Sequence, residues 1–244
     1  MRAAPPPQFY RVRAAAGTQP RLVGRSEELS SAVAAIESNG GAVIVGPEGI
    51  GKTALANAAA RATGQDYHVV HVRGSSFSAG TAYGALAWVL SEMPETPLDN
   101  PVLVLRALRT HLTARAGGRQ TLLVVDNLHE LDALSQTAIV QLMRQSATAM
   151  LATTPDLLRC GDELVRLWSE GMIRRIDLGP LDPAGSLALM EEITGGRLSA
   201  LAAHAVWRQT RGNPLFTSLL CRDQVSAGRL RERSGIWTLA GPLS

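Results

Sequence analysis

A short apolar run that stops at a glycine-rich octet constrains the fold of this chain more than any other feature. The run covers residues 42–45, and the octet at residues 46–53 reads Gly-Pro-Glu-Gly-Ile-Gly-Lys-Thr. The run is too short for a helix and predicts a buried β-strand. The glycines let the main chain curl so that several N–H groups point at one anion. The sequence therefore predicts a strand, an anion-binding loop and a helix in that order.

The octet fits the G-x-x-x-x-G-K-[ST] pattern of a phosphate-binding loop. A helix that begins near Gly51 adds the positive end of its dipole, and Lys52 reaches the β- and γ-phosphates. The Thr53 hydroxyl is a candidate Mg²⁺ ligand. The predicted nucleotide-contacting residues of this segment are Gly46, Pro47, Glu48, Gly49, Ile50, Gly51, Lys52, Thr53 and Ala54.

Lys52 is the only lysine in a chain that contains 23 arginines. A compact ammonium group on a flexible stem acts as a point charge, whereas a guanidinium is a planar fork. The single lysine at this position therefore supports a phosphate site. The alternative is a glycine-rich turn between a strand and a helix that binds no ligand.

Strand-like and helix-like segments alternate along the first three quarters of the chain. The expected strands are 42–45, 68–72, 121–126, 149–154 and 173–178, and the expected helices are 27–38, 52–63, 82–90, 102–116, 133–144 and 162–168. Ser26 is a candidate N-cap of the first helix, and residues 74–80 are expected to be a loop. The alternation predicts an α/β fold, a three-layer P-loop NTPase with a five-stranded parallel sheet.

Composition divides the chain into three expected parts. Residues 1–20 are Pro-rich and basic and predict a disordered arm, and residues 21–180 predict the P-loop NTPase domain. Residues 181–244 predict a small helical lid domain with a possible C-terminal hairpin. Its expected helices are 182–193, 198–210 and 214–227, and the hairpin is expected within 229–239. We also expect the chain to be a fragment of a longer protein.

The net charge of +3 does not indicate a basic folded surface, because residues 1–21 contain four arginines, Arg2, Arg11, Arg13 and Arg21, and no acidic residue. We therefore do not predict nucleic-acid binding from it. Cys160 and Cys221 show no metal-binding or redox spacing, which favours two reduced thiols. No apolar run approaches the ~18 residues of a membrane span. We expect a soluble, cytoplasmic protein.

Asp126 is the expected partner of the phosphate-binding loop. It ends the apolar run Thr-Leu-Leu-Val-Val-Asp, so its carboxylate lies at the C-terminal edge of the expected sheet, where open α/β sheets bind ligands. There it would hold the Mg²⁺ of the nucleotide, directly or through water. The alternative is an aspartate that only caps the following turn.

Four segments occur in an order that resembles STAND-class signalling ATPases, which are AAA+-related switches. They are Leu-Val-Gly-Arg-x-x-Glu at 22–28, the octet, Leu-Leu-Val-Val-Asp at 122–126 and Gly-Asn-Pro-Leu-Phe at 212–216. The chain is most similar to the ATPase region of large LuxR-type and MalT-like bacterial transcriptional regulators. The stretch Gly-Ile-Trp-Thr-Leu-Ala-Gly-Pro-Leu at 235–243 also looks like that subgroup.

The resemblance implies roles for three further residues. Val23 and Arg25 would line the adenine and ribose end of the site, and Pro214, at the start of a lid helix, would press on the base. Without such roles, Val23 would be a core residue and Arg25 a solvated cation. Pro214 would then be an ordinary first residue of a helix, where proline is common.

Asn127 departs from the pattern of the family. Many relatives carry a second acid there to polarise the attacking water, and an amide can orient water but cannot take up its proton at neutral pH. Glu130 and His129 are candidate substitutes, with His129 also readable as a turn residue.

The expected γ-phosphate sensor is also incomplete. Relatives often have an arginine two positions after a threonine, whereas Thr153 is followed by Thr154 and Pro155. The candidate replacements for the missing charge are Arg159, Arg174 and Arg175. Loss of a transition-state arginine costs about 10³ to 10⁵ in rate at related sites. With Lys52, Asp126, Asn127 and Thr153 as the catalytic candidates, we expect tight binding of ATP or ADP and slow hydrolysis.

The leading functional hypothesis is a nucleotide-operated regulatory switch with Mg²⁺ as its metal. The expected partners are the nucleotide and either other proteins or a second copy of the chain on ATP binding. Specific DNA binding by these residues alone and membrane association are not expected. The retained alternative is an AAA+ assembly or loader ATPase that acts through oligomerisation, and a P-loop kinase or motor ATPase is a third hypothesis.

Overall fold

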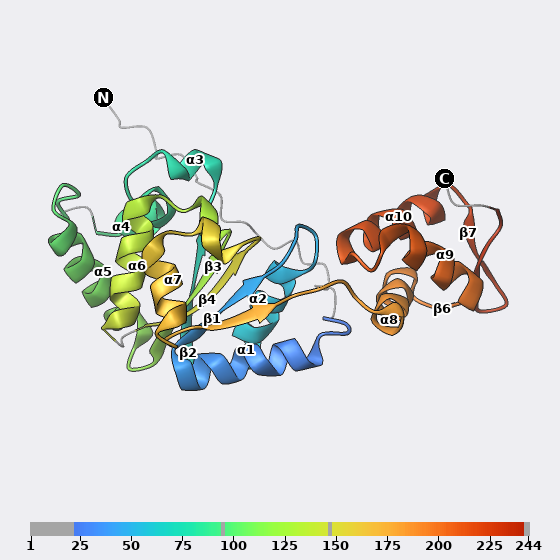
Figure 1. Cartoon of the computed structure of the whole chain (residues 1–244), viewed down its shortest axis with the longest axis horizontal. Coiled ribbons are helices and arrows are strands. Elements are labelled where there is room, and N and C mark those ends of the chain that lie inside the picture. Colours follow the sequence, from blue (N-terminus) through green and yellow to red (C-terminus); the bar gives the residue numbers. More distant parts are fainter. Residues whose placement is uncertain (1–21, 94–95, 146–147, 242–244) are drawn as a thin grey trace, which may run out of the picture.

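The computed structural model describes residues 22–93, 96–145 and 148–241 (Figure 1). The strands are β1 (Gly41–Val45), β2 (Tyr67–Arg73), β3 (Gln120–Asp126), β4 (Thr148–Thr154), β5 (Arg174–Asp177), β6 (Arg197–Leu198), β7 (Leu230–Arg233) and β8 (Ile236–Leu239). The α-helices are α1 (Ser26–Asn39), α2 (Lys52–Ala62), α3 (Ser76–Ala79), α4 (Ala87–Leu90), α5 (Pro101–Ala116), α6 (Ala133–Arg144), α7 (Asp162–Ser169), α8 (Pro183–Thr194), α9 (Ala200–Thr210) and α10 (Pro214–Ser226). Three 3₁₀ turns are η1 (Gly84–Leu86), η2 (Leu128–Glu130) and η3 (Leu157–Arg159).

Strands β1 to β5 form one parallel sheet in the order β2-β3-β4-β1-β5. Because every strand runs the same way, the C-terminal ends of all five meet at one edge. Strand β1 lies between β4 and β5, and the chain crosses to the far edge of the sheet before it forms β2. The predicted α/β fold, a P-loop NTPase with a five-stranded parallel sheet, is confirmed.

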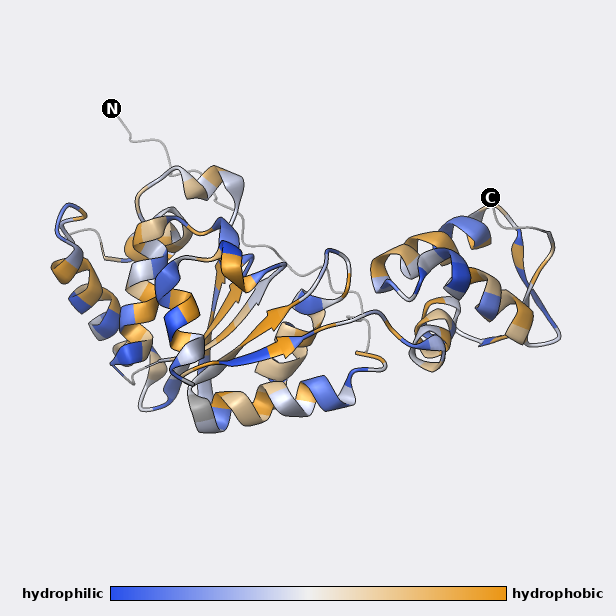
Figure 2. Cartoon of the chain, viewed as in Figure 1, coloured by the Kyte–Doolittle hydropathy of each residue, from blue (hydrophilic) through white to orange (hydrophobic). Residues whose placement is uncertain are grey.

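Alternate residues of the strands supply two separate cores, one on each face of the sheet. Ala42 and Ile44 point to the face covered by α1 and α2, whereas Val43 and Val45 point to the face covered by α5, α6 and α7. Figure 2 shows the same strands as mostly hydrophobic. A parallel sheet buried on both faces needs such near-continuous apolar strands, and this explains why the sequence pattern revealed it.

The chain beyond β5 forms a smaller body, which we call the helical segment (residues 181–241); the described residues before it are the sheet segment (residues 22–180). Helices α8, α9 and α10 pack with a three-stranded sheet of order β6-β8-β7. Their own apolar cluster includes Met190, Val206, Cys221 and Leu230. In Figure 1 this segment lies at the end of the molecule, beyond the connection that leaves β5.

Two local expectations were wrong, and one short strand was missed. Ser26 is the first residue of α1, not its cap; Arg25 holds the N-cap position and forms no side-chain cap bond, because its guanidinium is used elsewhere. The expected loop 74–80 contains the short helix α3, since Ser75 and Ser78 cap each other's backbone N–H groups. Strand β6 was missed because two residues carry no periodicity, and it pairs with β8.

The other boundaries agree with the sequence to within a few residues, and β7 and β8 form the expected hairpin. The expected helix 82–90 is divided into η1 and α4, and Tyr83 before it has a φ of 54°. The predicted disordered arm, residues 1–20, lies outside the described residues. No helix in the described part of the chain is long and apolar enough to cross a membrane.

Candidate functional site

The glycine-rich octet connects β1 to α2 at the C-terminal edge of the sheet. Gly49 and Gly51 have φ values of +74° and +98°, a region that side chains other than glycine rarely adopt. A Cβ atom on Gly46 would lie 2.5 Å from the carbonyl oxygen of Leu178, so this position also requires glycine. Helix α2 begins at Lys52, and its first N–H groups have no intrahelical partners. The loop is thus a main-chain cradle with unpaired donors, the chemistry that a phosphate needs.

The single lysine lies across this cradle. The Lys52 ammonium donates hydrogen bonds to the carbonyl oxygens of Gly46 at 2.8 Å and Pro47 at 2.9 Å. Burial lowers the pKa of Lys52, while the nearby charges of Asp126 and Glu48 act in the opposite direction. A bound polyanion would add to the effect of those acids, so binding and protonation of Lys52 favour each other.

Asp126 is joined to the loop and to the neighbouring strand. Its Oδ1 atom accepts hydrogen bonds from the Thr53 hydroxyl at 2.8 Å and from the Thr153 hydroxyl at 2.7 Å. The backbone N–H of Asn127 donates to the same Thr153 hydroxyl at 3.1 Å. Residues from β3, β4 and α2 are therefore brought together as the spacing required.

The oxygen atoms of Thr53 and Asp126 fit Mg²⁺, which prefers hard oxygen ligands and keeps several waters or phosphate oxygens. Within the described residues there is no group of three or more His, Cys, Asp or Glu side chains that could hold a metal ion alone. Mg²⁺ held by two protein oxygens completes its coordination with waters or phosphate oxygens.

The residues after Asp126 form a tight turn. Asn127 has a φ of 54°, and its side-chain amide donates to Glu130 Oε2 at 3.4 Å. His129 lies in η2, and its Nδ1 atom is buried without a hydrogen-bond partner in the described part of the structure. Burial lowers the pKa of His129, which favours its neutral form. Asn127 and Glu130 thus hold each other, and the amide occupies the position of the missing acid.

Val23 and Arg25 lie where the sheet segment meets the helical segment. Val23 is half-buried, and Arg25 is only 7% exposed, so it is not a solvated cation. The Arg25 guanidinium donates to Glu28 at 2.9 Å and to the carbonyl oxygen of Gly179. The chain at residues 22–25 is therefore fixed against the connection that leaves β5.

Helix α10 approaches the glycine-rich octet directly, with Pro214 as its first residue and Asn213 as its cap. The Asn213 amide donates to the carbonyl oxygen of Glu48 at 3.0 Å, and the Leu215 N–H donates to that of Gly49 at 3.1 Å. A Cβ on Gly49 would lie 2.8 Å from Leu215 Cβ. In the described residues these are the two hydrogen bonds that join the sheet segment to the helical segment.

Sequence reasoning did not identify three residues of this region. Asn213 and Leu215 stand in the quoted Gly-Asn-Pro-Leu-Phe segment, but nothing in that segment indicates that it contacts the octet. Arg73 was missed because the second strand was expected to end at residue 72, whereas β2 continues to Arg73 beside Asp126. A one-residue extension of that strand would have placed an arginine at the C-terminal edge.

Comparison with known proteins gives one family and several structures. The family described as "AAA ATPase domain" matches residues 21–153, more than half of the chain. The RuvB Holliday junction branch migration motor of Thermotoga maritima is similar, with a TM-score of 0.55, 16% identity, and coverage of 82% of this chain and 61% of that chain. A point mutant of the same RuvB protein gives a TM-score of 0.57 and 15% identity, with 85% and 65% covered.

The Hsp104-ADP complex of S. cerevisiae has a TM-score of 0.57 and 18% identity, and the match covers 85% of this chain and 32% of that one. The chain spans less than two thirds of the length of each of these structures. At such identities the likeness shows the fold alone. No match was found among curated proteins.

Proposed function

The chain belongs to the AAA ATPase domain family, and on that premise we propose that it is an ATP- and ADP-binding regulatory switch with slow ATP hydrolysis. The proposal divides the chain into an NTPase domain at residues 21–180 and a helical lid domain at residues 181–244. The nucleotide would lie in the octet at the C-terminal edge of the sheet. Members of the family bind nucleotide, typically with Mg²⁺.

Each candidate residue has a proposed part in nucleotide binding. The octet and Ala54 would surround the phosphates, and Lys52 would leave its two carbonyl partners for them. Thr53 and Asp126 would hold the Mg²⁺ that neutralises part of the phosphate charge. Val23 and Arg25 would line the adenine and ribose end. Pro214 would press on the base.

One observation carries the switch proposal: the octet is hydrogen-bonded to the first turn of α10. Asn213 and Leu215 contact the carbonyl groups of Glu48 and Gly49, inside the loop that would wrap the phosphates. Any difference in loop conformation between the ATP-bound and ADP-bound states would therefore change the position of α10 relative to the sheet. A switch requires this kind of differential contact between two states.

Slow hydrolysis follows from the groups around Asp126. Asn127 cannot accept a proton from water at neutral pH, and its amide is already engaged with Glu130. Thr153 supplies a hydroxyl where relatives also place an arginine nearby. We expect turnover below about one per second, near the low end for ordinary enzymes.

The resemblance to LuxR-type and MalT-like regulators, carried by residues 22–28, 212–216 and 235–243, supports an ATPase module of a transcriptional regulator. In that setting the partners would be other proteins or a second copy of the chain. These residues alone would not bind specific DNA, and the protein would act in the cytoplasm. The alternative, an assembly or loader ATPase, predicts a nucleotide-dependent increase in mass.

The test measures ATP and ADP affinity, turnover and solution mass for the wild type and for Lys52→Ala. Loss of the ammonium should weaken binding of both nucleotides by about 100-fold, because a charge-assisted contact to phosphate is lost in a desolvated loop. Arg106→Ala is the control, since Arg106 lies on α5, across the sheet from α2. Unchanged affinity in Lys52→Ala would show that the site is wrongly placed. Turnover well above one per second would exclude slow hydrolysis.

A further inference from the structure

Four side chains form a row across the C-terminal edge of the sheet. The register pairs Arg73 with Asp126 and Ile44 with Thr153. Val125 pairs with Ala152, so the next residues on those strands, Asp126 and Thr153, lie side by side. Residues in register on neighbouring strands point to the same face. The row therefore runs Arg73, Asp126, Thr153, Ile44 on the face covered by α2, the helix that the octet begins.

Arg73 is the cation of this row, and its interaction with Asp126 is weak. Its Nε atom lies 4.0 Å from Asp126 Oδ2, longer than a hydrogen bond, and its side chain is 74% exposed. The other carboxylate oxygen, Oδ1, already accepts from Thr53 and Thr153. Among the described residues the Arg73 guanidinium forms no hydrogen bond, and its Nε atom lies beside the carboxylate that accepts from Thr53.

The arginines considered from the sequence are less well placed. Arg175 donates three hydrogen bonds to Asp177, and Arg174 is in register with Ala42, near the start of β1 and away from the octet. Arg159 is exposed and lies in η3, five residues beyond the end of β4.

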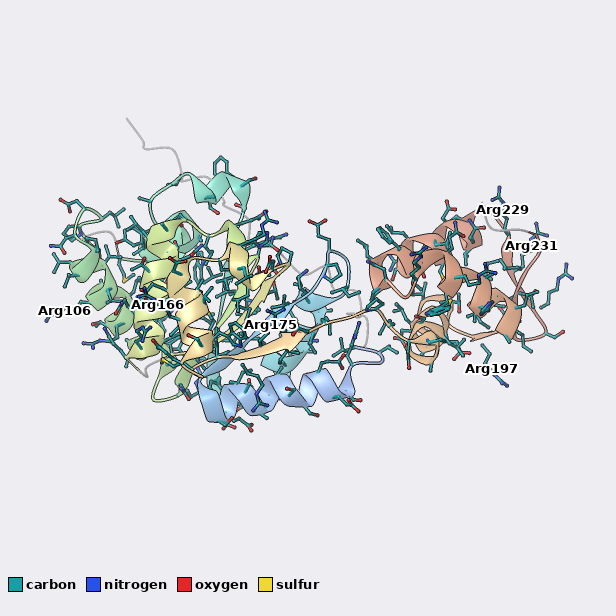
Figure 3. The ribbon with its side chains drawn as sticks, in the orientation of Figure 1. Arg106, Arg166, Arg175, Arg197, Arg229 and Arg231 are labelled. Carbon is teal, nitrogen blue, oxygen red and sulfur yellow. The ribbon has the colours of Figure 1, made fainter. Side chains whose placement is uncertain are left out.

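Other arginines either form hydrogen bonds elsewhere or lie far from the octet. Arg25 is bonded to Glu28 and Gly179. Figure 3 shows Arg197, Arg229 and Arg231 on the part of the helical segment that lies away from the sheet. Arg106 and Arg166 belong to α5 and α7, which cover the opposite face of the sheet. Arg73 therefore lies on the same face and at the same edge as Asp126 and Thr153, and among the described residues its guanidinium forms no hydrogen bond.

We propose that Arg73 is the arginine that contacts the terminal phosphate of bound ATP and makes the site prefer ATP to ADP. This inference rests on the proposed function, because it needs a nucleotide in the octet. Asp126 keeps the guanidinium beside the site by charge attraction. The planar fork donates charge-assisted hydrogen bonds to the γ-phosphate oxygens, a contact that ADP cannot make. The competing explanation is that Arg73 only neutralises Asp126 and has no contact with phosphate.

The experiment measures dissociation constants of ATP and ADP, with Mg²⁺, for the wild type, Arg73→Ala, Arg73→Lys and Arg159→Ala. Arg73→Ala should weaken ATP binding about tenfold or more and change ADP binding less than about twofold, because one charge-assisted phosphate contact is lost. Arg73→Lys should recover part of the ATP affinity, since a point charge replaces the fork. Arg159→Ala is the matched control, an exposed arginine in η3 after strand β4 rather than at the end of β2, and should leave both constants unchanged.

Equal losses for ATP and ADP in Arg73→Ala would show that Arg73 only positions Asp126, and no loss would show that it has no part; either result overturns the inference. A selective loss of ATP binding in Arg159→Ala alone would assign the role to Arg159 and also overturn it. Lys52→Ala separates this failure from failure of the site: if Lys52→Ala weakens both nucleotides and Arg73→Ala weakens neither, only the inference falls. A thermal melt of each variant confirms that it is folded.

Discussion

The sheet segment and the helical segment differ in the size of their apolar cores. Each face of the sheet has its own extensive core, and strand residues such as Ile44 and Leu122 are fully buried. The helical segment depends on one small cluster around Met190 and Val206. The comparison teaches that the phosphate cradle belongs to the stable part, and the element that contacts it belongs to the weaker part.

The contacts within the sheet segment near residue 180 also differ from those that join it to the helical segment. Residues 22–25 and the connection after β5 are joined through Arg25, whereas α10 reaches the octet by two hydrogen bonds. A contact that small contributes little to overall stability, since each hydrogen bond adds only about 0.5–1.5 kcal/mol net. Because the contact lies at the octet, it would instead couple the conformation of the phosphate-binding loop to the position of α10.

The largest expected effect comes from truncating the core of the helical segment. Met190→Ala removes a fully buried side chain from the small cluster and should destabilise that segment by about 2–5 kcal/mol. We expect the helical segment to unfold at a lower temperature than the sheet segment. Tryptophan fluorescence separates the two when it is recorded on variants that keep only the helical-segment pair, Trp207 and Trp237, or only the sheet-segment pair, Trp88 and Trp168.

The control for this prediction is Leu122→Ala, which removes an equally buried side chain from the sheet. It should lower the unfolding temperature of the sheet segment and with it nucleotide binding. In Met190→Ala and in Leu122→Ala, one unfolding transition reported by both tryptophan pairs would contradict a difference in stability between the segments. The two segments would then unfold as one unit.

A smaller effect is expected from the hydrogen bonds at the start of α10. Asn213 and Asn100 both precede a proline and accept two backbone N–H groups with Oδ1, but only Asn213 also donates to Glu48. Asn213→Asp keeps the cap acceptor and loses the donor. It should cost about 0.5–1.5 kcal/mol more than Asn100→Asp, because a hydrogen bond to the octet is lost in addition.

The measurement is chemical denaturation of both variants, followed by hydrogen exchange of α10 amides with and without ATP. Asn213→Asp should weaken the effect of ATP on exchange in α10, whereas Asn100→Asp should leave it unchanged. Equal exchange behaviour in the two variants would mean that the contact with Glu48 does not couple the segments.

The smallest expected effect is a difference in thiol reactivity between the segments. Cys160 and Cys221 are both buried, and burial raises the pKa of each thiol, to about 11 for Cys221. Because the thiolate is the reactive form, direct labelling of folded Cys221 would keep rising up to about pH 11. Labelling through local opening would level off near pH 8.5, the ordinary value of a free thiol.

We expect the opening route, with Cys221 labelled about tenfold faster than Cys160, since a smaller core opens more often. Labelling followed by mass spectrometry gives both rates, and ATP should slow the reaction of Cys221. A faster reaction at Cys160 would reverse the ranking of the two segments.

The fold was accessible from the sequence because its signals are local. The octet between an apolar strand and a helix, and the apolar run that ends in Asp126, each predict their structure from neighbouring residues. Their meeting also follows from parallel strands, whose C-terminal ends share one edge. The hydrogen bond between Thr53 and Asp126 was thus foreseeable.

Contacts between the segments were not accessible in the same way. Asn213 and Glu48 are 165 residues apart, and no periodicity encodes where a helical segment rests. The burial of Arg25 depends on a carbonyl group at Gly179 that only the folded chain brings near. The position of Arg73 beside Asp126 was not predicted, because strand ends are uncertain by a residue or two. Its pairing with Asp126 depends on the last residue of β2.

The contact of Gly49 with Leu215 makes the octet the point about which helix α10 would tilt. Helix α10 has 13 residues, so it is a stiff rod about 20 Å long. A tilt of about 10° at that point displaces the far end of the rod by roughly 3.5 Å. A change in the octet that tilts the helix is thereby magnified into a movement that another protein could detect.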